Sequence, residues 1–91
     1  MERYPTKIPG YYGTPENLAQ HLSRLRYDVN LAINRQLVLE YRKQAASDEK
    51  AGRPKLAREL RAYANLLEKN VEQMEKIFKI CKDKPGMKDE I

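Results

Sequence analysis

Two long stretches of this chain carry apolar residues at helical spacing, and a Gly-Arg-Pro turn at residues 52–54 separates them. Steps of three and four residues place side chains on one face of a helix. Glycine commonly ends a helix because it accepts a left-handed backbone, and proline commonly begins one. The pattern predicts two helices, over residues 15–49 and 54–83, that the turn joins into an antiparallel hairpin.

The first predicted helix has a clear beginning and more apolar surface than a hairpin needs. Thr14 is a favourable N-cap, and Pro15 suits the first helical position. A long apolar seam follows, with the members Leu18, Leu22, Leu25, Val29, Ile33, Leu37, Tyr41 and Ala45. A second strip lies about 180–220° from Leu18 on a helical wheel and consists of Tyr27, Leu31 and Val38. Because a hairpin covers one side of each helix, the other strip needs another partner.

We expect this surplus apolar surface to hold a partner protein or a second copy of the chain. The residues assigned to this contact are Tyr27, Leu31, Leu37, Val38, Leu39, Tyr11 and Tyr12. A chain of 91 residues has a small core, and pairing two hairpins would enlarge it. The predicted fold is therefore all-α, an antiparallel two-helix hairpin with an extended arm that assembles as a homodimeric four-helix bundle.

The second predicted helix carries a regular seam of alternating four- and three-residue steps, formed by Leu56, Leu60, Tyr63, Leu67, Asn70, Met74, Ile77 and Cys81. Such spacing is typical of a coiled-coil seam. Asn70 is its one polar member. Either Asn70 is buried and sets the register, or the seam drifts so that Val71 faces the core, and both alternatives remain open.

The ends of the chain lack the helical pattern. Residues 1–13 form an arm in which prolines and glycines interrupt any helix. The tyrosines are concentrated near this end of the chain, with four of the six before residue 28. The arm either folds back on its own hairpin or docks on a partner. Residues 14–86 make up the hairpin domain, and residues 87–91 form a short tail.

Positive charge gathers around the predicted turn. The chain has 18 Lys and Arg against 13 Asp and Glu, a net charge of +5. That balance argues against a DNA mimic, which would be acidic. The cations near the turn are Arg42, Lys43, Lys50, Arg53, Lys55, Arg58 and Arg61. Cations at a helix N-terminus favour phosphate, so the alternative function is nucleic-acid binding through the phosphate backbone.

Catalytic patterns are missing from the sequence. His21 is the one histidine and Cys81 the one cysteine, so we expect no metal site, no cofactor and no enzymatic activity. We also expect no membrane span, because no apolar run is long enough. A single cysteine favours a reducing compartment, and we expect a cytoplasmic protein. The predicted function is a non-enzymatic interaction protein that binds itself and an unidentified partner protein.

Overall fold

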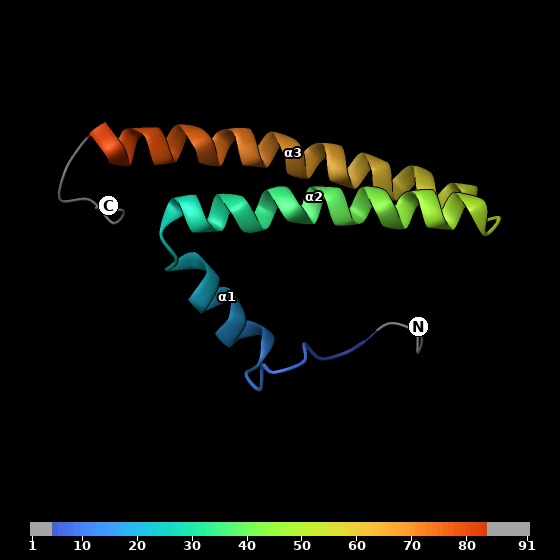
Figure 1. The fold of residues 1–91 in the computed structure, drawn as a ribbon, viewed down its shortest axis with the longest axis horizontal. Coiled ribbons are helices and arrows are strands. Elements are labelled where there is room, and N and C mark those ends of the chain that lie inside the picture. The colour runs from blue at the N-terminus through green and yellow to red at the C-terminus, as the bar shows by residue number, and fades with distance from the viewer. Residues whose placement is uncertain (1–4, 84–91) are drawn as a thin grey trace.

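The structure, a computed structural model, describes residues 5–83 and is all-α over that range. Its helices are α1 (Pro15–Ser23), α2 (Tyr27–Lys50) and α3 (Pro54–Asp83). Helices α2 and α3 lie side by side and antiparallel, and α1 leaves the start of α2 at an angle (Figure 1). The predicted all-α hairpin is confirmed. The predicted tail at 87–91 and the first four residues of the arm lie outside the described residues.

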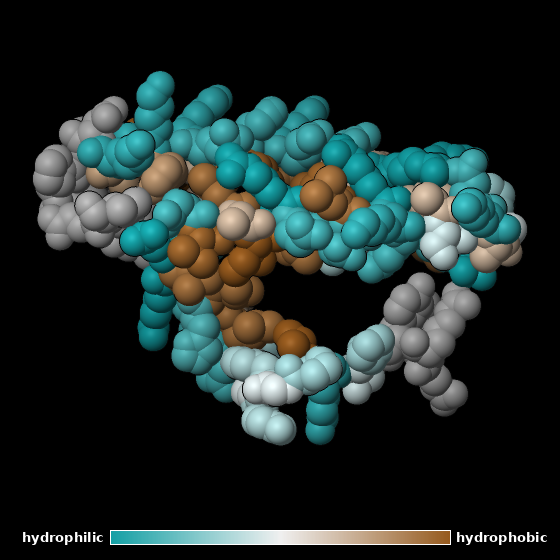
Figure 2. Space-filling view, in the orientation of Figure 1, coloured by the Kyte–Doolittle hydropathy of each residue, from teal (hydrophilic) through white to brown (hydrophobic). Residues whose placement is uncertain are grey.

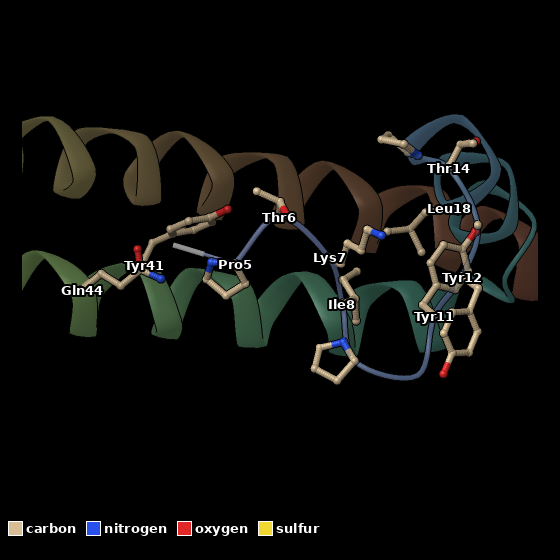
Figure 3. A pocket seen from close by; sticks show the side chains of 13 residues that line it. Pro5, Thr6, Lys7, Ile8, Tyr11, Tyr12, Thr14, Leu18, Tyr41 and Gln44 are labelled. Atoms are coloured by element: carbon tan, nitrogen blue, oxygen red, sulfur yellow. The ribbon is translucent and has the colours of Figure 1, made fainter. Parts of the chain in front are cut away.

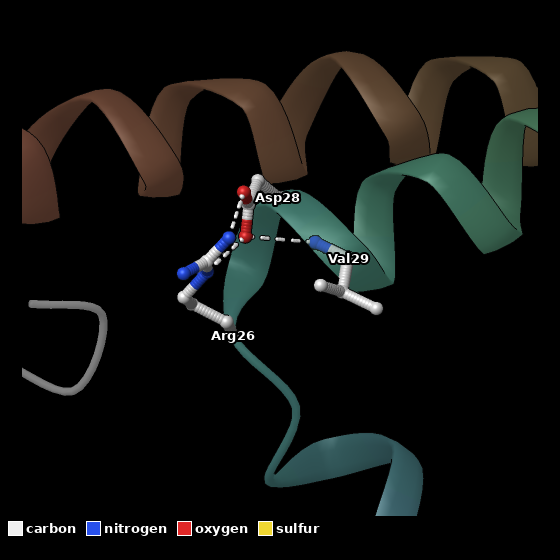
Figure 4. Close-up of polar contacts among 3 residues, drawn as sticks. All are labelled: Arg26, Asp28 and Val29. Atoms are coloured by element: carbon white, nitrogen blue, oxygen red, sulfur yellow. Dashed lines mark hydrogen bonds and ion pairs between the residues drawn. The ribbon is translucent and has the colours of Figure 1, made fainter. Parts of the chain in front are cut away.

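The single helix predicted over residues 15–49 is wrong, because residues 24–26 interrupt it. Polar side chains here bond to backbone groups that a continuous helix would use itself. Asn30 donates from Nδ2 to the carbonyl of Leu22 at 3.0 Å. The carboxylate of Asp28 accepts the N–H of Val29 at 2.9 Å in the first turn of α2 (Figure 4).

Asp28 is held in place by the residue that precedes α2. Arg26 donates from Nε and Nη2 to the two carboxylate oxygens of Asp28, at 2.7 and 2.8 Å (Figure 4). The hydrogen bond from Arg26 keeps the pKa of the Asp28 carboxyl below its usual value. An ionised acid in the first turn of a helix also interacts favourably with the helix dipole, so this pair favours the break.

The turn between α2 and α3 has the glycine ending that the sequence predicts. Gly52 adopts φ of +82°, a left-handed conformation that glycine reaches without strain. The N–H of Gly52 donates to the carbonyl of Glu49 at 3.1 Å, and that of Arg53 donates to the carbonyl of Asp48 at 2.8 Å. This pair of bonds is a Schellman motif, which satisfies two carbonyls at the end of α2.

The core runs along the seam between α2 and α3, and it is narrow. Its buried cluster consists of Leu31, Val38, Ala64 and Val71. Ala45 and Ala57 are also fully buried. Small residues at 45, 57 and 64 allow the two helices to approach closely near the turn, where little volume is left for larger side chains.

The buried residues of α2 differ from the apolar seam that the sequence predicts. Leu31 and Val38 were expected to bind a partner, but both are buried inside the hairpin. Ile33, expected inside as a seam residue, is partly exposed instead, and so is Leu37, which the sequence places both in the seam and in the partner contact. The predicted seam advances by steps of four residues, and each step turns about 40° around the helix, so the seam does not stay on the side of α2 that faces α3. On α3 the open alternative is settled, because Val71 is buried and Asn70 is exposed.

Helix α1 is positioned by its ends rather than by a core of its own. A capping box holds its start: Thr14 Oγ1 accepts the N–H of Asn17 at 3.1 Å, and Asn17 Oδ1 accepts the N–H of Thr14 at 3.2 Å. No residue of α1 is buried. Apolar side chains nonetheless gather where α1 meets α2, beside an opening between the arm and the hairpin (Figure 2).

Candidate interaction face

One side of the hairpin is lined by partly exposed apolar side chains from both long helices. At 100° per residue, these positions lie on the same side of the seam in α2 and α3. Tyr41 and Tyr63 meet across the seam there, with ring centroids 5.3 Å apart in an edge-to-face arrangement. We call this side the apolar face, and its members are Ile33, Leu37, Tyr41, Leu56, Tyr63 and Leu67.

The opposite side of the hairpin is closed by ion pairs between the helices. Arg42 Nη2 lies 2.9 Å from Glu68 Oε1, and Arg35 Nη2 lies 3.3 Å from Glu75 Oε2. A third pair joins Glu49 to Arg61. We call this side the charged face, with the members Arg35, Arg42, Glu49, Arg61, Glu68 and Glu75.

Two leucines of α2, Leu37 and Leu39, lie on different faces of the hairpin. Leu37 and Leu39 are both partly exposed, at 37% and 51%. Leu37 belongs to the apolar face, whereas Leu39 lines a shallow groove on the charged face together with Arg35, Arg42 and Glu75. The sequence interpretation assigned both leucines to one binding surface, but they lie on opposite sides of the hairpin.

Cations are excluded from the apolar face. Within α2 and α3, the helical positions about 60–160° from the seam on this side include no Lys or Arg. They include three acids, of which Asp48 is buried, and neutral amides such as Gln44 and Asn70. A third of the chain is charged, so a band of this length without Lys or Arg distinguishes the face from the rest of the surface.

The cations expected at the hairpin tip are brought together only in part. Four of them are paired with acids, namely Arg42, Lys43, Arg53 and Arg61. Lys50, Lys55 and Arg58 form no ion pair within residues 5–83. The free positive charge at the tip is therefore about half of what the sequence indicated.

Asp48 was missed by the sequence interpretation, which counted it only as a charge. It is 3% exposed, and Arg53 donates to its Oδ1 from Nε at 2.9 Å. Its second oxygen, Oδ2, is buried and has no hydrogen-bond partner within the described residues. The five-residue spacing across a glycine could have suggested the pair, since a Schellman turn brings these two positions together.

The arm, α1 and the middle of α2 surround an open cavity of about 730 Å³. Apolar side chains supply much of its lining, including Ile8 and Tyr11 from the arm, Leu18 from α1 and Tyr41 from α2 (Figure 3). Tyr11 also packs edge-on against His21, with ring centroids 6.5 Å apart. Tyr12 is 97% exposed. We call this cavity the arm groove. The arm folds back toward its own hairpin, which is one of the two predicted alternatives, and the arm groove lies between the arm and the hairpin.

Tyr27, the remaining predicted contact residue, is half-buried at the start of α2. Residues that sequence reasoning did not assign to a binding surface are Leu56 and Tyr63, which were placed in the core seam but are 37% and 51% exposed. The signal was present in the seven-residue repeat of Leu56, Tyr63, Asn70 and Ile77, which marks one line along α3.

Two glutamates of the hairpin have perturbed titration. The hydrogen bond and charge of Arg42 lower the pKa of the Glu68 carboxyl. The hydrogen bond from Gln36, at 2.7 Å, and the nearby charge of Lys43 lower the pKa of Glu40. Both shifts favour the ionised form, which suits a structural ion pair rather than proton transfer.

Among residues 5–83, no group of three or more His, Cys, Asp or Glu side chains is arranged to hold a metal ion. Within the same range, none of the helices has the length and apolar character needed to cross a membrane. Comparison with known proteins gives no further identification: no family model, curated protein or solved structure matches this chain.

Proposed function

We propose that this chain is a non-enzymatic helical assembly protein that self-associates through the apolar face into a homodimeric four-helix bundle. The observation that carries the proposal is the contrast between the two sides of the hairpin. Three ion pairs close the charged face, while the apolar face leaves Leu37, Leu56 and Tyr63 partly exposed and carries no cation.

The α3 row of the apolar face supports a second copy as its occupant. The row from Leu56 to Ile77 extends about 32 Å at 1.5 Å per residue. None of its residues lines the arm groove, whereas Tyr41 of α2 does.

The charge distribution supports the same occupant. Each copy carries a net charge of +5, and two such chains repel if their basic surfaces meet. Apposition of two apolar faces keeps every Lys and Arg of α2 and α3 outside the contact. A two-fold dimer uses the same patch on both subunits, so one cation-free face is sufficient.

Two leucine substitutions test the dimer. Leu37→Glu places a charge in the apolar face, whereas Leu39→Glu is the matched control on the charged face. We expect light scattering to give a dimer for the wild type and for Leu39→Glu, and a monomer for Leu37→Glu, with helix content retained in all three. A monomeric wild type at high concentration contradicts the proposal, as does an equal effect of the two substitutions.

The proposal includes a partner protein bound in the arm groove. Support comes from Ile8, Tyr11 and Leu18, which line the groove, and from Tyr12, which is nearly fully exposed beside it. A pull-down from the source cells compares the wild type with Leu18→Glu. We expect a protein retained by the wild type to be lost with Leu18→Glu while the dimer persists, and equal retention by both contradicts this part.

The cytoplasmic location belongs to the same proposal and is supported by the single, buried Cys81, which has no second cysteine to pair with in its own chain.

A second candidate function is phosphate-backbone binding at the hairpin tip. Lys50, Lys55 and Arg58 form no ion pair within residues 5–83, and the first turn of α3 contains no acid. Three phosphate contacts predict a slope of about −2.7 for log affinity against log salt with duplex DNA. A polarisation assay at two salt concentrations tests this, with Lys55→Ala/Arg58→Ala as the variant and Arg35→Ala as the control. Absence of binding at low salt excludes the candidate.

A further inference from the structure

The arm and α1 lie over the part of the apolar face that α2 contributes. Tyr41 and Gln44 of α2 line the arm groove, and its other walls come from the arm and from Leu18 of α1. The arm runs beneath α2, and α1 connects it to the start of that helix (Figure 1). A second copy can therefore reach this part of the apolar face only when the arm and α1 have moved aside.

The arm and α1 are held to the hairpin by few buried contacts. No residue of α1 is buried, and the leucines that it and the bend direct toward the hairpin, Leu18, Leu22 and Leu25, are only half-buried. An open groove of about 730 Å³ separates the arm from α2. Segments with little buried apolar surface open at a low cost in free energy. The arm and α1 can therefore leave α2 while the core between α2 and α3 stays intact.

The bend between α1 and α2 is not imposed by the backbone. A helix bends sharply at proline, at glycine or where a side chain inserts into its hydrogen bonds. Residues 24–26 are Arg-Leu-Arg, which are good helix formers. The inserted side chain is that of Asn30, whose Nδ2 donates to the carbonyl of Leu22 at 3.0 Å. In a continuous helix that carbonyl would accept the N–H of Arg26. The same residues can therefore form either a bend or a straight helix.

A straight helix would lengthen the apolar face. At 100° per residue, a continuous helix over residues 15–50 places five apolar side chains within about 80° of one another, namely Leu18, Leu22, Leu25, Val29 and Ile33. This row ends at Ile33, which belongs to the apolar face. In a single chain the row would be exposed to water, whereas a second copy on the apolar face would cover it. Straightening is therefore favoured by self-association.

Resting on the proposed self-association, we propose that residues 5–23 form an autoinhibitory strap over the apolar face, with residues 24–26 as its hinge. In the closed monomer the strap covers the α2 part of the face. In the dimer the hinge is helical, the strap lies away from α2, and the second copy takes its place. The two states exclude each other because the strap and the second copy occupy the same surface at Tyr41.

The strap weakens dimerisation twice, because each dimer needs two open chains. A ligand that binds only the open state has an apparent dissociation constant raised by the inverse of the open fraction, so for this dimer the open fraction enters squared. Asn30→Ala removes the hydrogen bond to the carbonyl of Leu22, and a bond of this kind corresponds to about a fivefold change in population. We therefore expect Asn30→Ala to lower the dissociation constant of the dimer by about 25-fold in sedimentation equilibrium.

Arg26→Pro should have the opposite effect. The φ of Arg26 is −54°, which lies within the range that the proline ring imposes. The bend therefore accepts a proline, whereas a proline inside the straight helix lowers its population by more than about a hundredfold. We expect Arg26→Pro to stay monomeric at concentrations where the wild type is a dimer. Asn65→Ala is the control, because it loses a hydrogen bond from Arg42 on the charged face and should leave the dissociation constant unchanged.

A distance between two spin labels shows whether the strap moves. The labels are attached through Glu16→Cys and Ser47→Cys, two exposed positions, in a Cys81→Ala background. In a straight helix they lie about 46 Å apart, at 1.5 Å for each of the 31 residues between them. In the closed state they lie closer, because α1 folds back beneath α2 (Figure 1). We expect the shorter distance for the dilute wild type and about 46 Å for labelled chains in an excess of unlabelled dimer.

The outcomes separate the strap from the proposed function. A wild-type dimer that keeps the shorter distance overturns the strap while self-association stands, and so does an unchanged dissociation constant for Asn30→Ala. Circular dichroism checks that Arg26→Pro folds, and the other two measurements decide without it. If neither the wild type nor Asn30→Ala forms a dimer at high concentration, the self-association is overturned and the strap with it.

Discussion

The two residues of the ion pair at the hairpin turn, Asp48 and Arg53, should differ in how much stability is lost when each is truncated. Asp48 is 3% exposed, whereas the side chain of Arg53 is 37% exposed. Removing Arg53 leaves a buried carboxylate whose Oδ1 loses its donors and whose Oδ2 has no hydrogen-bond partner within the described residues. Removing Asp48 leaves a guanidinium that water already reaches. The cost of the two truncations should therefore differ.

The magnitudes follow from that asymmetry. An uncompensated buried charge costs about 3–5 kcal/mol, and water that enters where the arginine stood favours the lower end, about 3 kcal/mol for Arg53→Ala. Asp48→Ala should cost about 1 kcal/mol, the value of a typical lost hydrogen bond. The double variant should match Asp48→Ala, because neither charge remains, and so should be more stable than Arg53→Ala alone.

Urea unfolding followed by circular dichroism measures these differences at one fixed protein concentration, since association changes the apparent stability. Both substitutions leave the backbone bonds of the Schellman turn in place, so the slope against urea should stay constant. If Arg53→Ala destabilises no more than Asp48→Ala, the carboxylate is hydrated in the native protein and the reasoning from burial fails.

Three further predictions concern single contacts. Gly52→Ala should destabilise the hairpin by about 1 kcal/mol in the same urea assay, because its φ of +82° strains a residue with a Cβ although nothing lies within 4 Å of that atom. Thr14→Ala should speed amide exchange in α1 by roughly fivefold, the effect of a cap worth about 1 kcal/mol, while α3 keeps its protection. Arg42→Gln should return the pKa of Glu68 to its ordinary value in a carboxyl NMR titration. Since the folded pKa of Glu68 is depressed, the stability difference between wild type and variant should be present above the unfolded pKa and vanish as pH falls through the folded one.

The sequence was sufficient for the elements that depend on local chemistry. Thr14 and Pro15 begin α1, Gly52 ends α2, and Pro54 begins α3 as predicted. Each of these positions is decided by the residue itself, through its φ or its capping side chain. The all-α class and the antiparallel hairpin follow from them together with the spacing of apolar residues.

The face of α2 that enters the core could not be read in the same way. The predicted seam from Val29 to Ala45 advances by four residues at each step, and each such step turns about 40° around the helix. Positions seven residues apart, such as Leu31, Val38 and Ala45, turn only about 20° the other way and so keep nearly one direction along α2. The seven-residue row is therefore the one that α3 covers, and the four-residue row leaves the core.

The fold also changes the balance between the apolar surface, which the sequence favours as the binding site, and the basic tip, which it offers as the alternative. Charge counted along the chain ignores which acids lie across the hairpin, and Glu49 and Glu68 neutralise arginines that are 12 and 26 residues away. Counting apolar residues along the chain underestimates the apolar surface, because the turn separates the residues of α2 and α3 that share one face. Packing α2 against α3 pairs charges, which reduces the unpaired positive charge at the tip. It also places two half-exposed apolar rows side by side, which enlarges the continuous apolar surface. An interface argued from the folded hairpin therefore includes Leu37 of α2 and Tyr63 of α3, which the turn separates in the sequence.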